Sequence, residues 1–567
     1  MKTSESKFIR KSTGAFYTPP NLASYVASKM SKLFPKKHSI TILDPAVGDG
    51  ALLLAFQPFA NSKQVLFAGV DINEDAIEST SEKMKRKNLS THLFCTDTLS
   101  PYNLDLKSGW NKIKERLNID FFDAIISNPP WGADFDKSDS ATSVLSTAIG
   151  QYDIYDLFLE LSIELLSEGG VYGFIIPDSI YRKEHYSIRK KLLSETTIKF
   201  IARIGEFIFD GVSTSVSVVI GYKSKPSNEN ICSRVHFPNK IAKLIAANKM
   251  SFSAAEKGIV HPCKQQFFID SDFALSIDVA QSDLDIIDIL DSSPTVGQYL
   301  SSHRGVELSK KGNVVQCPKC QYWMPMPKNG TLQYKCNHCK NAFIIDSAVS
   351  DIIISKNIPE DNNSAPFLSG EDLERYFYQS KSRIRYNFEG INYKNLSIYN
   401  QPKILVRKTG VGITAVLDYH NHIVNQVVYL LTPKTCAQHI PIEFFIAVIN
   451  SRIITYYIIK KYGLANWCTH PYLSQTMVEK LPIPDFHSFT VNEWECVNRI
   501  SVLVKQIYST QLINNDTDIE IEKKLLTLFN INESSFLDML NAIESVEQMI
   551  PFKRLLKIPK EAWATVI

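Results

Sequence analysis

The sequence predicts an α/β domain with a mixed, mainly parallel sheet, followed by an α+β domain around a cysteine-rich segment and by a helical C-terminal region. Three observations carry this prediction. Short apolar runs that end in acidic, glycine or proline turns alternate with helical patterns up to residue 222. Two Cys-x-x-Cys pairs follow further along the chain, separated by 15 residues. Towards the C-terminus most apolar residues recur at helical spacing. With a turn-rich boundary after residue 222, we expect domains at residues 1–222, 223–485 and 486–567.

The composition is that of a globular protein with a large core, with 44% hydrophobic residues, 21% charged residues and a net charge of +3. Such a small net charge neither requires nor excludes a nucleic-acid partner, because basic patches can lie on one face. The chain shows no apolar leader and no long uncharged apolar run, so we expect no signal peptide and no membrane span. Its ten cysteines favour a reducing cytosol with a metal site over a disulfide framework.

The first predicted helix lies at residues 21–33, after a pair of prolines. Pro19 and Pro20 suit the first turn of this helix, and Thr18 is placed as its N-cap. The apolar run 40–43 then predicts a strand, which is followed by a loop with two glycines and by another helix. Glycines let the backbone approach a ligand closely.

Three consecutive predicted strands end in acidic residues. The strands at residues 40–43, 65–70 and 92–95 are followed by Asp44, Asp71 and Asp97. The carboxyl edge of an open α/β sheet is where ligands bind. Asp44 and Asp49 in the first loop would repel a pyrophosphate but would suit an ammonium group. Asp71 is placed like a carboxylate that accepts ribose hydroxyls, and Asp97 could accept an amino hydrogen.

A fourth strand, at residues 121–127, ends in Asn128-Pro129-Pro130-Trp131. Proline cannot continue a β-ladder, so Asn128 is expected at the same sheet edge. The Asn128 side-chain oxygen and the Pro129 carbonyl, held rigid by Pro130, could accept both hydrogens of an exocyclic amine. Trp131 could stack on the ring that carries this amine.

Downstream of this motif we expect a helix at residues 153–166, a buried strand at 171–176 and a hairpin within 204–220. The hairpin loop contains Phe207 and Phe209. Phe209 adjoins the turn at Asp210 and Gly211, which makes it the better candidate for contact with a ligand, although burial in the core would explain either ring.

The two Cys-x-x-Cys pairs have the spacing of a zinc ribbon, which we place at residues 312–345. Their members are Cys317, Cys320, Cys336 and Cys339. Four thiolates leave no open coordination position, so Zn²⁺ would be structural.

Basic side chains interleaved with aromatic residues and glycine turns surround the ribbon and suit contacts to phosphates and bases. The candidates are Arg304, Lys310, Lys311, Arg383, Arg385, Arg407 and Lys408. The apolar pattern at residues 443–462 predicts one helical segment. The stretch at residues 481–484, which contains Pro482, is expected to close it.

Five motifs occur in a fixed order: Tyr-Thr-Pro-Pro, Asp-Pro-Ala-x-Gly-x-Gly, Gly-Val-Asp-Ile, Asp-Thr and Asn-Pro-Pro-Trp. In this order they resemble the S-adenosylmethionine-dependent N6-adenine DNA methyltransferases, and the arrangement is similar to that of the gamma class of TaqI-like enzymes. The region from about residue 302 resembles, more loosely, the target-recognition domain of TaqI-like and type IIG enzymes. The resemblance implies a Rossmann-like methyltransferase domain followed by a target-recognition domain.

The resemblance also assigns roles to residues. It places Thr18, Asp44, Ala46 and Gly48 at the methionine end of the cofactor, Asp71 at its ribose and Asp97 at its adenine. It also assigns Tyr17, Ile72 and Thr98 to the cofactor site. It makes Asn128, Pro129, Pro130, Trp131 and Phe209 the group that holds the target base.

The implied activity is methyl transfer from S-adenosylmethionine to N6 of an adenine flipped out of double-stranded DNA. The protein would be the modification component of a restriction-modification or related phage-defence system, cytoplasmic and nucleoid-associated in a prokaryote, with a separate restriction endonuclease as a candidate partner. No nuclease core of paired acidic residues and a lysine is evident before Gly14 or after Pro484. Two alternatives remain, a catalytically inactive DNA-binding specificity subunit with the same fold and a methyltransferase acting on protein glutamine.

Overall fold

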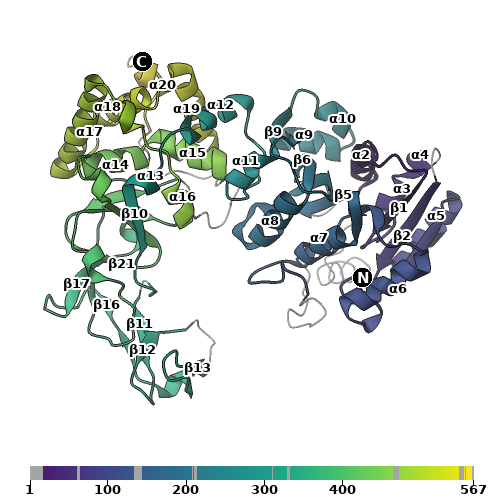
Figure 1. Cartoon of the computed structure of the whole chain (residues 1–567), viewed down its shortest axis with the longest axis horizontal. Helices are drawn as coiled ribbons and strands as arrows, with labels where there is room; N and C mark the ends of the chain where they lie inside the picture. The colour runs from purple at the N-terminus through teal and green to yellow at the C-terminus, as the bar shows by residue number, and fades with distance from the viewer. Residues whose placement is uncertain are drawn as a thin grey trace. The chain divides into compact units, whose positions relative to one another are not determined.

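The computed structural model describes residues 17–60, 64–132, 144–206, 208–209, 214–309, 311–327, 333–410, 412–463, 472–547, 555 and 557–564. The chain divides into two compact units, residues 1–281 and 282–567. Figure 1 follows the chain through both, from the purple N-terminal strands to the yellow C-terminal helices.

Unit 1 is built on one nine-stranded sheet with the strand order β3-β2-β1-β4-β5-β7-β6-β8-β9. The strands are β1 (Ser39–Asp44), β2 (Gln64–Asp71), β3 (Thr91–Cys95), β4 (Phe122–Ser127), β5 (Leu166–Pro177), β6 (Thr197–Gly205), β7 (Val216–Tyr222), β8 (Ile231–His236) and β9 (Val260–Lys264). The first five pair in parallel, β7 runs antiparallel between β5 and β6, and β9 runs antiparallel to β8. This arrangement confirms the predicted Rossmann-like, mainly parallel fold.

Helices flank this sheet. They are α2 (Pro20–Ser31), α3 (Ala51–Leu54), α4 (Gln57–Ala60), α5 (Glu74–Arg86), α6 (Leu106–Leu117), α7 (Ile154–Leu165), α8 (Tyr186–Glu195), α9 (Asn239–Ala246), α10 (Phe252–Ala255) and α11 (Gln265–Asp270). Helix α5 packs on β2 and β3, α7 on β5, α8 on β6, and α2 across β5 and β7. The β4 strand is buried along its whole length, as its continuous apolar run predicts.

The sheet of unit 1 extends beyond the predicted domain boundary at residue 222. Strand β8 pairs in parallel with β6, from Phe200↔Ser233 to Arg203↔His236, and β9 completes the edge. The structure therefore places the division of the chain at Gln281. The turn-rich stretch after Tyr222 is a surface loop within the unit, since composition marks loops but cannot tell which of them separates domains.

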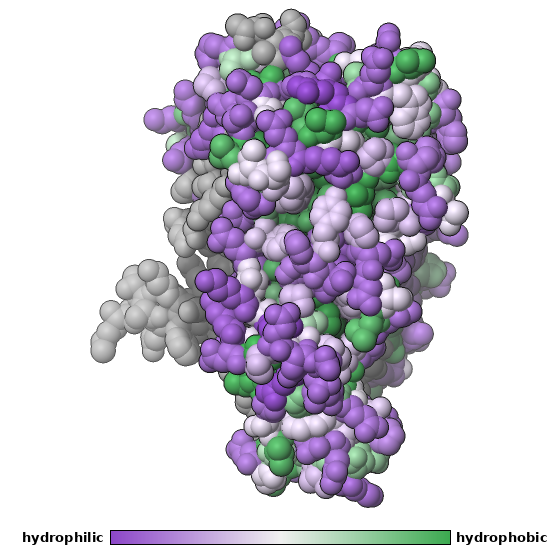
Figure 2. Space-filling view, turned by 90° about the vertical axis from the view of Figure 1, so that its left-hand side faces the viewer, coloured by the Kyte–Doolittle hydropathy of each residue, from purple (hydrophilic) through white to green (hydrophobic). Residues whose placement is uncertain are grey.

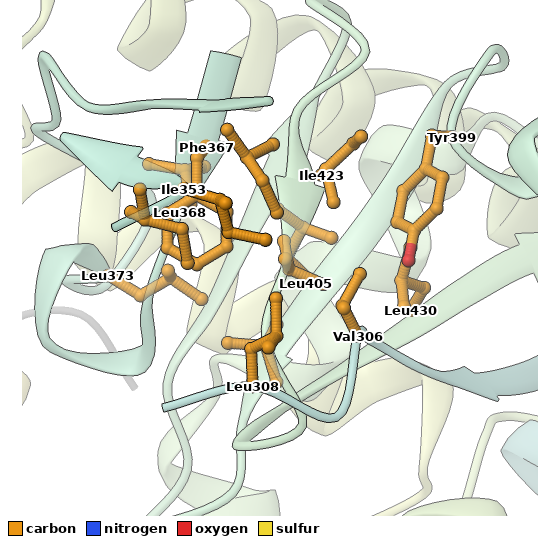
Figure 3. Packing of buried hydrophobic residues seen from close by; sticks show 14 of the residues in the cluster. Val306, Leu308, Ile353, Phe367, Leu368, Leu373, Tyr399, Leu405, Ile423 and Leu430 are labelled. Carbon is orange, nitrogen blue, oxygen red and sulfur yellow. The ribbon is translucent and has the colours of Figure 1, made fainter. Parts of the chain in front are cut away.

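Unit 2 begins with α12 (Gln281–Asp291) and α13 (Val296–Tyr299) and is mainly β-structure up to residue 433. One sheet contains β10 (Leu300–Arg304), β22 (Val428–Pro433), β19 (Lys403–Arg407) and β20 (Ala415–Asp418); another contains β16 (Ile354–Ser355), β18 (Arg383–Arg385), β17 (Ser364–Leu368) and β21 (Ile423–Val424). Figure 3 shows side chains of both sheets meeting in one core, among them Leu405 and Leu430 of the first sheet and Phe367 of the second. This packing provides a rigid body for the cysteine-rich segment.

The cysteine-rich segment forms its own small β-structure. Strands β12 (Trp323–Pro325), β11 (Asn313–Gln316) and β15 (Ser350–Ile352) make one sheet, and β13 (Gln333–Lys335) and β14 (Ala342–Ile344) make a hairpin. Each cysteine pair lies in a tight turn followed by a left-handed residue, Gln321 (φ 58°) or Lys340 (φ 63°). In both turns the first cysteine accepts a backbone hydrogen bond from this residue, at 2.9 Å and 3.1 Å.

Helices complete unit 2. They are α14 (Ile442–Ile449), α15 (Arg452–Tyr462), α16 (Gln475–Glu479), α17 (Val491–Thr510), α18 (Asn515–Leu528), α19 (Glu533–Glu547) and α20 (Lys560–Ala564). The single helical segment predicted at 443–462 is two helices, α14 and α15. The break arises because the Asn450 side chain donates to and accepts from the backbone of Ala415, at 2.9 Å each, while the Ser451 hydroxyl caps α15.

A buried charge network joins the C-terminal helices to the rest of unit 2. Asp518 of α18 accepts from Arg375 at 2.7 Å and from Arg452 at 2.8 Å, and Arg452 also pairs with Glu522 at 3.3 Å. Burial alone would raise the pKa of Asp518, but the two arginines lower it to about 2. The last helices are therefore an integral part of unit 2.

No single helix among the described residues is long and apolar enough to cross a bilayer. Helices α14 and α15 reach that length and composition only together, with a bend of 50° between them. Their apolar side chains are buried inside unit 2.

Candidate functional site

The predicted site residues of unit 1 lie at the carboxyl edge of its sheet. β1 lies between β2 and β4, and Leu43 of β1 is in register with Ile125 of β4. The chain turns outward in opposite directions from these two central strands, which makes this edge the topological switch point of the sheet. Asp44, Asp71 and Asn128 therefore project from neighbouring strand ends.

Asn128 meets Thr18 across 110 residues of sequence. The Asn128 Nδ2 atom donates to the Thr18 hydroxyl at 3.1 Å. The prediction that Thr18 caps the first helix is wrong: α2 begins at Pro20, Pro19 stands at the N-cap, and no side chain caps it. The buried Thr18 hydroxyl instead joins the Tyr-Thr-Pro-Pro motif to the Asn-Pro-Pro-Trp motif.

The glycine loop after β1 is held in place by Asp71. One carboxylate oxygen of Asp71 accepts from the Gly48 N–H at 2.8 Å, and the other accepts from the Asn73 N–H at 2.9 Å. Gly48 has φ +51°, and a Cβ atom there would come within 3.3 Å of the Tyr17 ring. Gly48 therefore lets the Tyr17 ring approach the loop backbone closely. Each Asp71 oxygen keeps a second lone pair for a ligand.

Asp44 is fully buried at the end of β1. Its Oδ1 atom accepts from the Ala46 N–H at 3.1 Å, whereas its Oδ2 atom has no hydrogen-bond partner among the described residues. Burial raises the pKa of Asp44 to about 8, against the opposing effect of the Ala46 hydrogen bond and with help from the negative charges of Asp71 and Asp49. A buried carboxylate with one unpartnered oxygen is suited to a cationic ligand group.

The ends of β2 and β3 offer one apolar and one acidic group. The Ile72 side chain is 72% exposed directly after Asp71, which provides an apolar face for a flat ring. Asp97 is exposed, and its Oδ1 atom accepts from the Leu99 N–H at 3.0 Å. The Thr98 hydroxyl is buried and donates to the Pro45 carbonyl, so this hydrogen bond holds the loop after β1 in place.

Trp131 and Phe209 are in direct contact. Their ring centroids lie 5.2 Å apart at an interplanar angle of 82°, and both side chains are buried. Gly132, directly after Trp131, is attached to the start of α7, because its N–H donates to the Asp153 carboxylate at 3.1 Å. Phe207, the other candidate ring, lies outside the described residues.

Asp178 is a site residue that the sequence analysis missed. It follows β5, and its carboxylate accepts from Arg203 Nε at 2.6 Å, Ser215 Oγ at 2.6 Å and Ser217 Oγ at 2.7 Å. Arg203 lies in β6 and the two serines lie at the start of β7, so Asp178 joins both stems of the loop that carries Phe209. Asp178 ends an apolar run just as Asp44 and Asp71 do, and that signal could have found it.

The four cysteines of the two Cys-x-x-Cys pairs come together as predicted. Their sulfur atoms all lie within 4.8 Å of one another, with 3.7 Å between Cys317 and Cys339 and 3.6 Å between Cys320 and Cys336. A tetrahedral site with Zn–S bonds of about 2.3 Å separates its sulfur atoms by about 3.8 Å. The cluster therefore fits a tetrahedral zinc ion.

The basic residues predicted to bind DNA are in different environments. Arg383 pairs with Glu360 at 3.4 Å, and Arg385 pairs with Asp351 at 3.2 Å and donates to the Ile352 carbonyl. Arg304 donates to Gln475, and Arg407 contacts Thr409. Lys408 lies over the Tyr472 ring, and Lys311 is exposed. Lys310 lies outside the described residues. Arg383 and Arg385 are thus paired with acidic residues of neighbouring segments, and these ion pairs help to hold β18 in place.

Comparison with known proteins gives the family of both units. Residues 5–281 match the family described as N-6 DNA Methylase, and residues 365–483 match the TaqI-like C-terminal specificity domain. Unit 1 belongs to the N-6 DNA methylase family. The catalytic match of the chain coincides with unit 1, and its specificity match lies within unit 2.

The chain spans only part of the length of the curated relatives that it matches. A Methanocaldococcus jannaschii protein named as a type II restriction enzyme and methyltransferase is 23% identical over 87% of this chain and 36% of its own length. The type II methyltransferase M.VspI of a Vibrio species is 26% identical over 42% of this chain and 56% of its own length. The solved structure of the type IIG restriction endonuclease BpuSI aligns with 95% of this methylase and 66% of that chain, at 13% identity and a TM-score of 0.39.

Proposed function

We propose that this N-6 DNA methylase transfers a methyl group from S-adenosylmethionine to N6 of an adenine flipped out of double-stranded DNA, as the modification component of a restriction-modification or related defence system. The observation that carries the proposal is the contact between Thr18 and Asn128 at the switch point of the sheet. It supports the proposal because Asn128 could hold a planar amine close to the glycine loop that Asp71 supports. The methyl donor and the methyl acceptor would then bind at neighbouring sites.

The residues around the glycine loop fit the proposed cofactor. Asp44 would face the ammonium of its methionine end, Asp71 would accept its ribose hydroxyls, and Ile72 would cover its adenine ring. When bound, S-adenosylmethionine supplies a methyl group on a positively charged sulfur, open to direct attack by a nitrogen lone pair. Positioning of the two reactants would then contribute most of the rate.

Asn128 and Pro129 would prepare the adenine amine for attack. The lone pair of this amine is delocalised into the ring, which makes the amine a poor nucleophile. Two hydrogen-bond acceptors that hold its hydrogens favour a tetrahedral nitrogen and localise the lone pair. The Asn128 amide contacts Thr18 through its nitrogen, an orientation that leaves its oxygen as the acceptor.

Trp131 and Phe209 would hold the flipped base between them. Two rings that enclose a stacked base must lie about 7 Å apart, twice the usual ring spacing, whereas these rings meet edge to face at 5.2 Å. One ring must therefore move away from the other and rotate when the base enters. The loop between β6 and β7, which Asp178 holds at both stems, is the part that would adjust.

The proposal is tested by incubating the protein with methyl-labelled S-adenosylmethionine and mixed-sequence duplex DNA, followed by digestion to nucleosides. Labelled N6-methyl-2′-deoxyadenosine is the expected product. Cofactor binding without transfer would show the inactive specificity subunit instead. Label in protein glutamine and none in DNA would show the protein methyltransferase.

Cofactor binding should release a proton from Asp44. Because its pKa is about 8, Asp44 is mainly neutral at pH 7, and an ammonium at its Oδ2 atom would ionise it. We expect release of nearly one proton at pH 7 and tighter cofactor binding as the pH rises from 6 to 8. Calorimetry in buffers with different ionisation enthalpies measures this proton. In the Asp44→Asn variant the release should vanish, and an unchanged proton count would assign the release to another group.

Asp178→Ala should impair base flipping without weakening cofactor binding. Both stems of the Phe209 loop lose their shared acceptor, and misplacement of a positioning group by about 1 Å can cost roughly 100-fold in rate. We expect kcat to fall about 10- to 100-fold and the fluorescence rise of 2-aminopurine at the target position to shrink. Asp123→Ala is the matched control, because Asp123 is also buried and also accepts several hydrogen bonds. It lies at the start of β4, at the end of this strand that is opposite to Asn128. Equal loss of flipping in both variants would contradict the role of Asp178.

A further inference from the structure

The charged side chains of the zinc ribbon are all basic. Between Leu308 and Ile345 the sequence contains no aspartate or glutamate. The lysines of this segment are Lys310, Lys311, Lys319, Lys328, Lys335 and Lys340. Four thiolates on a divalent zinc ion leave two negative charges, so the segment stays positive even with the metal in place. Such a concentration of one sign of charge is unusual in a chain whose net charge is +3.

Three of these lysines, Lys319, Lys335 and Lys340, stand directly beside a cysteine of the cluster. All three are exposed, and none forms an ion pair within the described part of the chain. Lys340 donates only to a backbone carbonyl, that of Asn337, at 2.9 Å. Because the four cysteine sulfurs lie within 4.8 Å of one another, the three side chains start from one small region, the ribbon tip. Figure 2 shows this lower end of unit 2 as mostly hydrophilic.

A ring contact connects the two cysteine turns at the ribbon tip. Tyr322, just after the first turn, stacks on His338 of the second turn, with centroids 4.5 Å apart and an interplanar angle of 15°. The stack fixes the two turns relative to each other. The lysines on both turns therefore keep a constant spacing.

The ribbon is also fixed on the body of unit 2. The Trp323 N–H donates to the Glu389 carbonyl at 2.8 Å, and the Trp323 ring meets Phe388 edge to face at 4.9 Å. Arg385 completes the attachment through its ion pair with Asp351 of β15. These contacts keep the ribbon tip at a constant distance from the body of unit 2.

We propose that the ribbon tip binds the phosphate backbone of duplex DNA through Lys319, Lys335 and Lys340. This inference rests on the proposed function and adds a backbone contact to it. Arg383 and Arg385 have acidic partners, whereas the tip lysines form no ion pair with any residue that the structure describes and so stay available for phosphates. Contacts of this kind position a protein on DNA and carry no sequence information themselves.

The test is the salt dependence of DNA binding by the full-length protein with all three lysines replaced by glutamine. Each neutralised phosphate adds about 0.9 to the slope of log affinity against log salt, so three contacts add about 2.7. Between 50 and 200 mM salt, the affinity of the unaltered protein should fall roughly 40-fold more than that of the variant. The control Lys85→Gln/Lys87→Gln/Lys112→Gln removes the same charge from exposed side chains of unit 1, on α5, directly after α5 and on α6. These lysines are remote in sequence from the ribbon, and the salt slope of this variant should match that of the unaltered protein.

Two further measurements make the outcome decisive. Zinc content and cofactor affinity of the ribbon variant should equal those of the unaltered protein. An unchanged salt slope would overturn the proposal, and so would loss of zinc from the variant, which would show that the lysines balance the thiolate charge. If the unaltered protein binds no duplex DNA at all, the proposed function itself fails, a result distinct from either of these.

Discussion

Asn128→Ala is expected to lower methyl transfer by at least about 100-fold, the usual effect of removing one preorganised electrostatic contact to a reacting group. The variant loses the amide that would hold the target amine, whereas the Gly48 loop and its support by Asp71 stay intact. Affinity for S-adenosylmethionine should therefore change little. Single-turnover transfer to duplex DNA and cofactor titration by calorimetry measure the two effects separately.

Thr18 provides the matched controls for Asn128. Thr18→Ser keeps the hydroxyl that accepts from Asn128 and should retain most activity, while Thr18→Val removes it and should fall between Thr18→Ser and Asn128→Ala. If the rate of Asn128→Ala stayed within tenfold of the unaltered enzyme, another group would have to hold the amine.

Replacing Cys317 and Cys320 with serine should separate the two units functionally. Zinc would contribute folding free energy to a ribbon whose buried cluster is small, so its loss should unfold the ribbon. DNA affinity is expected to fall at least about 100-fold, while cofactor binding in unit 1 stays unchanged. Atomic emission, cofactor titration and DNA titration on one preparation provide the measurement.

The control for this change is Cys436→Ser/Cys496→Ser, which makes the same substitutions in unit 2 away from the cluster. These side chains should be dispensable for metal and DNA binding. Normal methylation by a zinc-free protein would show that the ribbon serves a purpose other than DNA recognition.

The core of unit 1 could be predicted because each central strand is a short apolar run that is followed by a polar residue. β1, β2 and β4 begin and end within about one residue of the predicted runs. The partner of Thr18 could not be predicted in this way, since local signals favour a helix cap and the actual contact is with Asn128. Strands β8 and β9 were missed for a similar reason, because their short runs contain Arg234, Pro262 and other residues that weaken the strand signal.

The cysteine cluster was predictable from spacing alone, because metal ligands must lie at a fixed separation. The surroundings of the basic side chains predicted to bind DNA could not be predicted in this way. Arg383 and Arg385 have the same local composition as exposed basic residues, and only the fold brings Glu360 and Asp351 next to them. The sequence shows where a charged residue stands in the chain, but the tertiary structure determines which residue forms an ion pair with it.

The buried charge network sets the limits for exchanging target specificity between relatives. The matched specificity region, residues 365–483, contains Arg375 and Arg452, but their partners Asp518 and Glu522 lie beyond it. A chimera that transplants only that region would bury two arginines against whatever helices the host supplies, and a broken buried pair costs about 3–5 kcal/mol. Viable hybrids must therefore carry α17 and α18 along with the region that selects the DNA site.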